Sequence, residues 1–170
     1  MLKKSLIGIA IAAGLLFGGV ASAMPLYSTD WKTTGDNLIT KDSNTGLEWL
    51  DLTETTSMSF DYVSSQFGAL GIFEGWRYAN MDKVASFWNA AGGDSSYYTT
   101  GWNSANNGLT AAVGAFTGFT RLDTEGLPNS IEIYGIMSDS SVLGKHQASL
   151  LWDYDGAMQD GAFADYTKID

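Results

Sequence analysis

The residues that could carry catalysis are few and form no recognisable catalytic arrangement. His146 is the only histidine, and no Gly-x-Ser-x-Gly segment presents a strained serine beside which it could act in a hydrolase triad. One histidine and no cysteine also leave the chain without the ligands that zinc prefers. A glycosidase needs only two carboxylates, but among 19 acidic residues no pair stands out. We therefore predict that the protein is not an enzyme and keep a two-carboxylate carbohydrate hydrolase as the alternative.

Calcium is the metal ion whose oxygen ligands this chain could supply. Asp153, Asp155 and Asp160 surround Gly156 in an acidic stretch. The glycine is the fourth residue of this stretch and no glutamate is the twelfth, so the stretch does not match an EF-hand. We expect no cofactor and no metal site.

The residues best suited to ligand recognition are three aromatic residues in the segment 93–107, namely Tyr97, Tyr98 and Trp102. Their neighbours are Gly, Ser, Thr and Asn. This mixture is typical of binding loops, because flat rings lose little conformational entropy on binding and small polar residues adapt. We predict that these three residues bind a ligand, since sugar rings stack well on such faces. The alternative is that the three rings fold back over the rim of the core.

Three other tryptophans are expected to be core residues, because they lie on elements with regular apolar spacing. They are Trp49, Trp76 and Trp88. Arg77 follows one of them directly. We expect its guanidinium to form an internal ion pair with Glu48 or Asp51.

The composition indicates one acidic domain. A chain of 170 residues with 45% hydrophobic and 13% aromatic content can bury one sizeable core. The net charge is −10, and removal of Lys3 and Lys4 would leave 7 basic against 19 acidic residues, or −12. Such a surface repels phosphate backbones and anionic lipids, so we expect no nucleic-acid partner and no binding to a membrane surface.

Residues 1–23 have the features of a signal peptide. Lys3 and Lys4 precede an apolar run from Leu6 to Val20, and Ala21-Ser22-Ala23 fits a cleavage site. The run is shorter than the ~20 apolar residues of a spanning helix, and no cysteine follows for lipid attachment. We expect a secreted domain of residues 24–170, in the periplasm or outside a Gram-negative cell, with no membrane insertion after cleavage and no disulfides.

Local patterns in the first half of the secreted part predict a hairpin and a helix. Residues 37–40 and 47–52 read as short strands, and residues 42–46 between them favour a turn. The helix that follows has Ser57 or Ser59 as its N-cap. Its apolar face is formed by Phe60, Val63, Phe67 and Leu70.

A second helix begins after residues 75–79, which are predicted to form a strand. Asn80 is the N-cap, Asp82 lies in the first turn where the helix dipole favours negative charge, and Gly92-Gly93 ends the helix. Residues 109–116 predict a third helix.

The last third of the chain changes character. Residues 130–136 and 148–154 alternate like paired antiparallel strands, and residues 93–107 and 122–130 read as long loops. Strands and helices do not alternate regularly along the chain. The prediction is an α+β fold, with an antiparallel sheet, two to three short helices and long loops.

Motifs within residues 41–91 resemble secreted proteins of exosortase-bearing Gram-negative bacteria, the PEP-CTERM type. The matching residues are the run from Asp42 to Thr53, the helix start Met58-Ser59-Phe60, and Gly75 to Asn80 before a helix. The chain ends at Asp170 without the sorting tail of that family, which leaves free secretion and a truncated gene as open alternatives.

A more distant similarity is to Lcl C-terminal-like domains. Their Gly-Leu-x-Trp strand matches Gly46 to Trp49, and their Trp-Arg-Leu-Pro-Thr turn matches Trp76 to Asn80, with Ala-Asn in place of Pro-Thr. This resemblance implies a C-type-lectin-like fold and a role in adhesion and glycan binding. The calcium loop of such lectins would be Glu-Pro-Asn, whereas residues 127–129 here are Leu-Pro-Asn.

Together these features predict a non-catalytic extracellular or cell-surface module in adhesion, biofilm matrix or glycan binding. Its expected partner is an extracellular glycan or matrix polymer. Two alternatives remain, which are a secreted carbohydrate hydrolase that uses two carboxylates and a structural matrix protein without a ligand.

Overall fold

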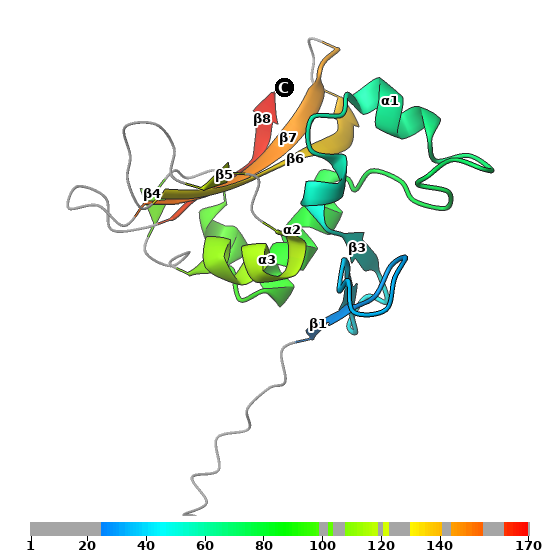
Figure 1. The fold of residues 1–170 in the computed structure, drawn as a ribbon. Coiled ribbons are helices and arrows are strands. Elements are labelled where there is room, and N and C mark those ends of the chain that lie inside the picture. The colour runs from blue at the N-terminus through cyan, green and yellow to red at the C-terminus, as the bar shows by residue number, and fades with distance from the viewer. Residues whose placement is uncertain are drawn as a thin grey trace, which may run out of the picture.

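The computed structural model describes residues 25–98, 102–103, 108–118, 121–122, 130–140, 144–154 and 162–169 (Figure 1). Within these residues the chain forms two antiparallel sheets and three α-helices. The predicted α+β class is therefore confirmed. No helix of the described residues combines the length and apolarity needed to cross a membrane.

The smaller sheet contains the predicted hairpin and one further strand. Its strands are β1 (Leu26–Thr29), β2 (Ile39–Asp42) and β3 (Glu48–Leu50), in the order β1-β2-β3. The turn between β2 and β3 forms as predicted, because the Asp42 carboxylate accepts the Asn44 N–H at 2.9 Å and Gly46 adopts φ +70°. β1 was not predicted. It has only four residues, and its pairing with β2 is what defines it as a strand.

The larger sheet has five strands in the order β4-β8-β7-β6-β5. Its long strands are β6 (Ser130–Ser140), β7 (His146–Tyr154) and β8 (Ala162–Ile169), and its short edge strands are β4 (Trp102–Asn103) and β5 (Arg121–Leu122). The predicted antiparallel pairing of the two late strands is confirmed in β6 and β7. The edge strands and β8 were not predicted.

The first helix is shorter than predicted. The 3-10 helix η1 (Leu52–Thr55) precedes α1 (Phe60–Ser65), for which Ser59 is the N-cap. The predicted apolar face was wrong beyond α1, because the chain turns back after Gln66 and buries Phe73 instead. Phe73 is 2% exposed, whereas Leu70 is 98% exposed at φ +69°.

The second and third helices are confirmed. Asn80 caps α2 (Met81–Ala90) by accepting the Lys83 N–H at 3.1 Å, and the Asp139 carboxylate accepts the Met81 N–H at 2.6 Å. The third helix, α3, spans Leu109–Thr117. The strand predicted over residues 75–79 was wrong, because this segment belongs to neither sheet. It is tied to β6 by a bond from Ser138 N–H to the Ala79 carbonyl at 2.9 Å.

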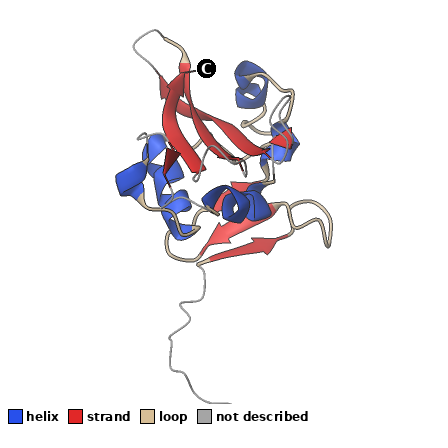
Figure 2. Ribbon diagram, turned by 90° about the vertical axis from the view of Figure 1, so that its left-hand side faces the viewer, coloured by secondary structure: helices blue, strands red, loops and turns tan. Residues whose placement is uncertain are grey.

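Helices α2 and α3 lie between the two sheets (Figure 2). The core is built from their apolar faces and the inner faces of the sheets. Its members include Leu26, Val84, Phe87, Trp88, Val113, Met137 and Leu151. The Thr40 hydroxyl donates to the Phe116 carbonyl at 2.7 Å and so ties β2 to α3. The prediction that Trp88 is a core residue is confirmed, since the side chain is 3% exposed.

Two leucines at opposite extremes of burial test this core. Leu151→Ala should cost about 2–5 kcal/mol of unfolding free energy, because the side chain is fully buried and its loss leaves a cavity. Leu70→Ala is the matched control and should change stability by less than about 0.5 kcal/mol. Urea unfolding followed by circular dichroism measures both. Equal losses would contradict this description of the core.

Candidate functional site

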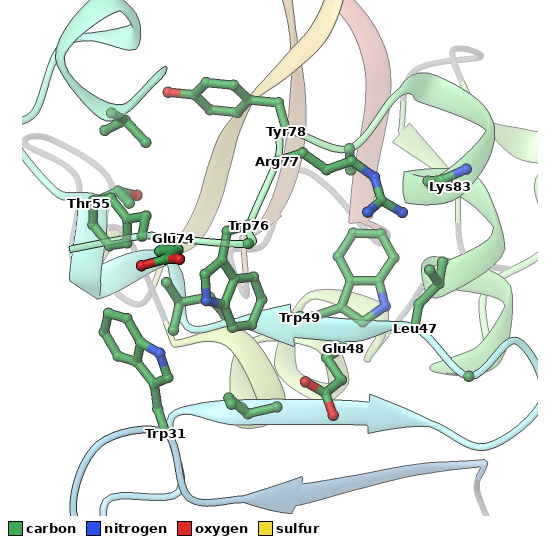
Figure 3. A pocket seen from close by; sticks show the side chains of 17 residues that line it. Trp31, Leu47, Glu48, Trp49, Thr55, Glu74, Trp76, Arg77, Tyr78 and Lys83 are labelled. Carbon is green, nitrogen blue, oxygen red and sulfur yellow. The ribbon is translucent and has the colours of Figure 1, made fainter. Parts of the chain in front are cut away.

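A cavity of about 680 Å³ lies between β3 and the segment 73–79 (Figure 3). One wall is formed by residues 46–50 and the other by residues 73–79. These segments belong to the two motifs that carry the resemblances noted in the sequence. Sequence reasoning did not predict that they share a cavity. The available signal was that both motifs combine tryptophan with charged residues.

Trp49 forms part of the cavity wall and also packs against the core. Its backbone pairs with Thr40 of β2, and its ring lies 4.6 Å from the Phe87 ring, centroid to centroid. The indole Nε1 is buried and has no hydrogen-bond partner within the part of the chain that the structure describes. Trp49 therefore packs against the core, as predicted, and the same side chain also lines the cavity.

An aromatic cluster closes one end of the cavity. Trp31 stacks on Phe73 with ring centroids 5.9 Å apart and meets Trp76 edge to face at 6.3 Å. Trp76 was expected in the core. It is only partly buried and lines the cavity instead, because the segment 75–79 passes over β3 without joining a sheet. Lys32 places its ammonium 3.4 Å from the centroid of the Trp31 ring.

Asp36 fixes the loop that carries Trp31. Its carboxylate accepts the N–H groups of Thr33 at 2.8 Å, Trp31 at 2.8 Å, Lys32 at 2.9 Å and Leu38 at 3.3 Å. These bonds, those from Thr33 and Trp31 foremost, hold the pKa of the Asp36 carboxyl well below its usual range. The loop is therefore preorganised by a charged acceptor, and Trp31 is presented to the cavity in a defined place.

The charged side chains of the cavity are not paired as predicted. Glu48 bonds to Lys41 of the neighbouring strand at 2.7 Å, which raises the pKa of the Lys41 ammonium. The Asp51 carboxylate caps η1. The expected pairing of Arg77 with either acid was therefore wrong. Within the described residues, Arg77 and Lys83 form no side-chain hydrogen bond or ion pair, and both line the cavity at its Trp49 end (Figure 3).

Tyr78 anchors the wall that carries Trp76 and Arg77. Its ring stacks on Phe60 of α1 at 4.3 Å, and Phe60 stacks in turn on His146. Burial raises the pKa of the Tyr78 hydroxyl, with a further contribution from the charge of Asp61. His146 thus supports the wall from behind and is not among the residues that line the cavity.

Of the three predicted ligand-binding residues, Tyr98 has a described side chain, and it does not line this cavity. Tyr98 is 3% exposed, its hydroxyl donates to Asn89 Oδ1 at 2.9 Å, and its ring meets Trp88 edge to face. This ring folds over the core, which is the alternative stated from the sequence. The side chains of Tyr97 and Trp102 lie outside the described residues. Their binding role therefore stays a prediction.

The described part of the chain brings together no group of three or more His, Asp or Glu side chains that could hold a metal ion. Asp155, Gly156, Asp160 and the loop 127–129 lie outside the described residues.

Asp36→Ala should lower stability at neutral pH, because the loop loses its central acceptor. A depressed folded-state pKa contributes stability that is present above the unfolded pKa of about 3.9 and is lost as pH falls towards the lower folded pKa. The wild-type urea midpoint should therefore fall more between about pH 5 and pH 2 than that of Asp36→Ala. Asp61→Ala, which removes an exposed carboxylate from α1, is the control. Parallel pH profiles for wild type and Asp36→Ala would refute the assignment.

Comparison with known proteins identified no relative of this chain. No protein-family model, no curated protein and no solved structure matches the chain. The PEP-CTERM-type and lectin-like resemblances accordingly stay predictions from the sequence.

Proposed function

We propose that this protein is a non-catalytic extracellular module that binds glycan in the cavity between β3 and the segment 73–79. Through this binding it acts in surface attachment or in a biofilm matrix. The observation that carries the proposal is the joint presence of tryptophan rings and charged side chains on the walls of one cavity.

The surface of a sugar has two kinds of group. Its C–H bonds form flat apolar patches that pack on aromatic rings, and its hydroxyls form hydrogen bonds with charged and amide side chains. Trp31, Trp49 and Trp76 supply the rings, while Glu74 and Arg77 supply an acceptor and donors. The volume of about 680 Å³ falls within the range of small-molecule sites.

The sequence supports an extracellular location for this binding. The apolar run from Leu6 to Val20 and the Ala-Ser-Ala that follows favour export. The net charge of −10 keeps such a protein soluble and disfavours nucleic acid as its ligand.

A carbohydrate hydrolase is the second candidate, because Glu48 and Glu74 line the same cavity. A hydrolase of this kind needs one carboxyl group that donates a proton to the leaving oxygen. Glu48 is bonded to the Lys41 ammonium and Glu74 accepts the Leu70 N–H at 3.0 Å. Both carboxylates are thus engaged as acceptors, which favours binding over hydrolysis.

A glycan array probed with the mature protein tests the proposal. For each glycan bound, Trp76→Ala should weaken binding by roughly 1–3 kcal/mol, the range known for stacking of a base on an aromatic side chain. Tyr27→Ala is the matched control, since Tyr27 is 50% exposed on β1 and does not line the cavity. Circular dichroism checks that both variants fold.

Two outcomes would contradict the proposal. Unchanged binding by Trp76→Ala would place the site elsewhere. Cleavage of an array glycan that is lost in Glu74→Gln would establish the hydrolase in its place.

A further inference from the structure

The Trp31 end of the cavity already holds a positively charged group. The Lys32 ammonium lies 3.4 Å from the centroid of the Trp31 ring. An ammonium within about 6 Å of an indole face is attracted by the negative potential of the ring. Trp31 lines the cavity, and Lys32 does not. The structure therefore shows a cation held over the ring of a residue that lines the cavity, and that cation is a side chain of the protein itself.

Two carboxylates add negative charge at the Trp31 end of the cavity. Glu74 lines the cavity near Trp31 and Trp76 (Figure 3). The Asp36 carboxylate accepts the backbone N–H groups of both Trp31 and Lys32, at 2.8 and 2.9 Å. With Glu74 and Asp36 opposed by one lysine, the local charge is negative. The whole chain, at −10, adds attraction for cations at longer range.

The positive charges of the cavity are at its other end. Figure 3 shows Arg77 and Lys83 on the Trp49 side, away from Trp31 and Glu74. Glu48 lies on the Trp49 side as well (Figure 3), but its charge is matched by Lys41 at 2.7 Å. The two positive charges that have no partner within the described residues are therefore at the Trp49 end, and the Glu74 carboxylate is at the Trp31 end. A ligand with an ammonium group would be oriented by this separation, because its cation is attracted to one end and repelled from the other.

We propose that the cavity binds an amino-sugar glycan, a polymer of hexosamine units with free ammonium groups, which rests on the glycan-binding function proposed above. A sugar ammonium takes the place of the Lys32 ammonium over Trp31 and lies near the Glu74 carboxylate. The C–H face of the same or the next unit packs on Trp76. Arg77, at the Trp49 end, donates hydrogen bonds to hydroxyl oxygens farther along the ligand.

Lys32 acts in this arrangement as an internal competitor. Its ammonium must leave the Trp31 ring before a ligand cation can bind there. Lys32 is exposed and adjacent to Trp31 in sequence, so its side chain can swing into solvent without disturbing the loop. Removal of Lys32 should therefore strengthen binding of a cationic ligand, whereas an ordinary contact residue would weaken binding when removed.

Isothermal titration with oligosaccharides of equal length tests the proposal. The probes are a glucosamine oligomer, its N-acetylated and hence neutral counterpart, and a lysine oligomer of matched charge, at a pH at which the sugar amines are protonated. The wild-type protein should bind the glucosamine oligomer about 3- to 30-fold more tightly than the neutral one, as a partly desolvated cation–π contact with a nearby carboxylate allows.

Two variants give the decisive comparison. Lys32→Ala should bind the glucosamine oligomer more tightly than wild type and the neutral oligomer equally well. Glu74→Gln should lose most of the preference for the glucosamine oligomer. Lys145→Ala is the control for Lys32→Ala, because it removes the same charge at an exposed position that does not line the cavity.

The outcomes separate this inference from the proposed function. Equal binding of both sugar oligomers would overturn the amino-sugar inference and leave glycan binding standing. If the protein binds neither sugar oligomer, the amino-sugar inference is overturned. The glycan array then decides separately whether the protein binds any glycan. A lysine oligomer that binds as tightly as the glucosamine oligomer would overturn it too, as would equal gains from Lys32→Ala and Lys145→Ala. Either result would show attraction by net charge alone.

Discussion

The packing of Trp49 on Phe87 connects the small sheet to the rest of the protein. The two rings, 4.6 Å apart, attach β3 to α2, and the outer part of Trp49 becomes a wall of the cavity. One side chain thus supports both the fold and the site. Stability and binding are coupled at this position, because a smaller residue would open the core and remove a cavity wall together. Trp31 and Trp76 line the cavity but are not part of the core cluster. Substitutions at these two positions therefore change ligand binding with less effect on stability than substitutions at Trp49.

The opposite wall is neither helix nor strand, and it is held in place by backbone hydrogen bonds and ring stacking. The turns between α1 and residue 73 are closed by backbone bonds, such as those from Phe73 N–H to the Gln66 carbonyl and from Gly75 N–H to the Phe67 carbonyl. Gly71 approaches Gln66 so closely that no larger side chain fits. Tyr78 then fixes the far end of the wall by stacking on Phe60. Loops of this kind, supported by a scaffold, commonly carry binding sites.

The carboxylates in and near the cavity are held in place mainly by hydrogen bonds from backbone N–H groups and less by ion pairs. Asp36 is held by backbone N–H groups, and Glu74 accepts the N–H of Leu70. The exception is Glu48, whose charge is matched by Lys41 across the strand pair. These bonds fix where the negative charges lie and leave the Arg77 guanidinium, which has no partner in the described region, available at the opposite end. Separation of charge across a cavity of this size gives a polar ligand a preferred direction.

Sequence by itself determined the elements whose signals are local. The Asn80 cap, the turn from Asp42 to Gly46 and the period-two alternation of β6 and β7 each act over a few residues, and each formed as predicted. Such signals describe how a segment bonds to itself or to its neighbour in the chain. They gave the α+β class, the three α-helices and four of the eight strands of the described residues.

Only the tertiary structure decided which side chains meet. Tyr98 and Leu70 illustrate this, since an aromatic residue in a polar segment became core and a leucine on a helical period became exposed. Arg77 was expected to form an ion pair with Glu48 or Asp51. Lys41 stands directly across the strand pair from Glu48 and forms the ion pair instead. The burial of side chains, the pairing of charges and the shape of the cavity depend on contacts between segments far apart in the chain. Local sequence patterns do not specify those contacts.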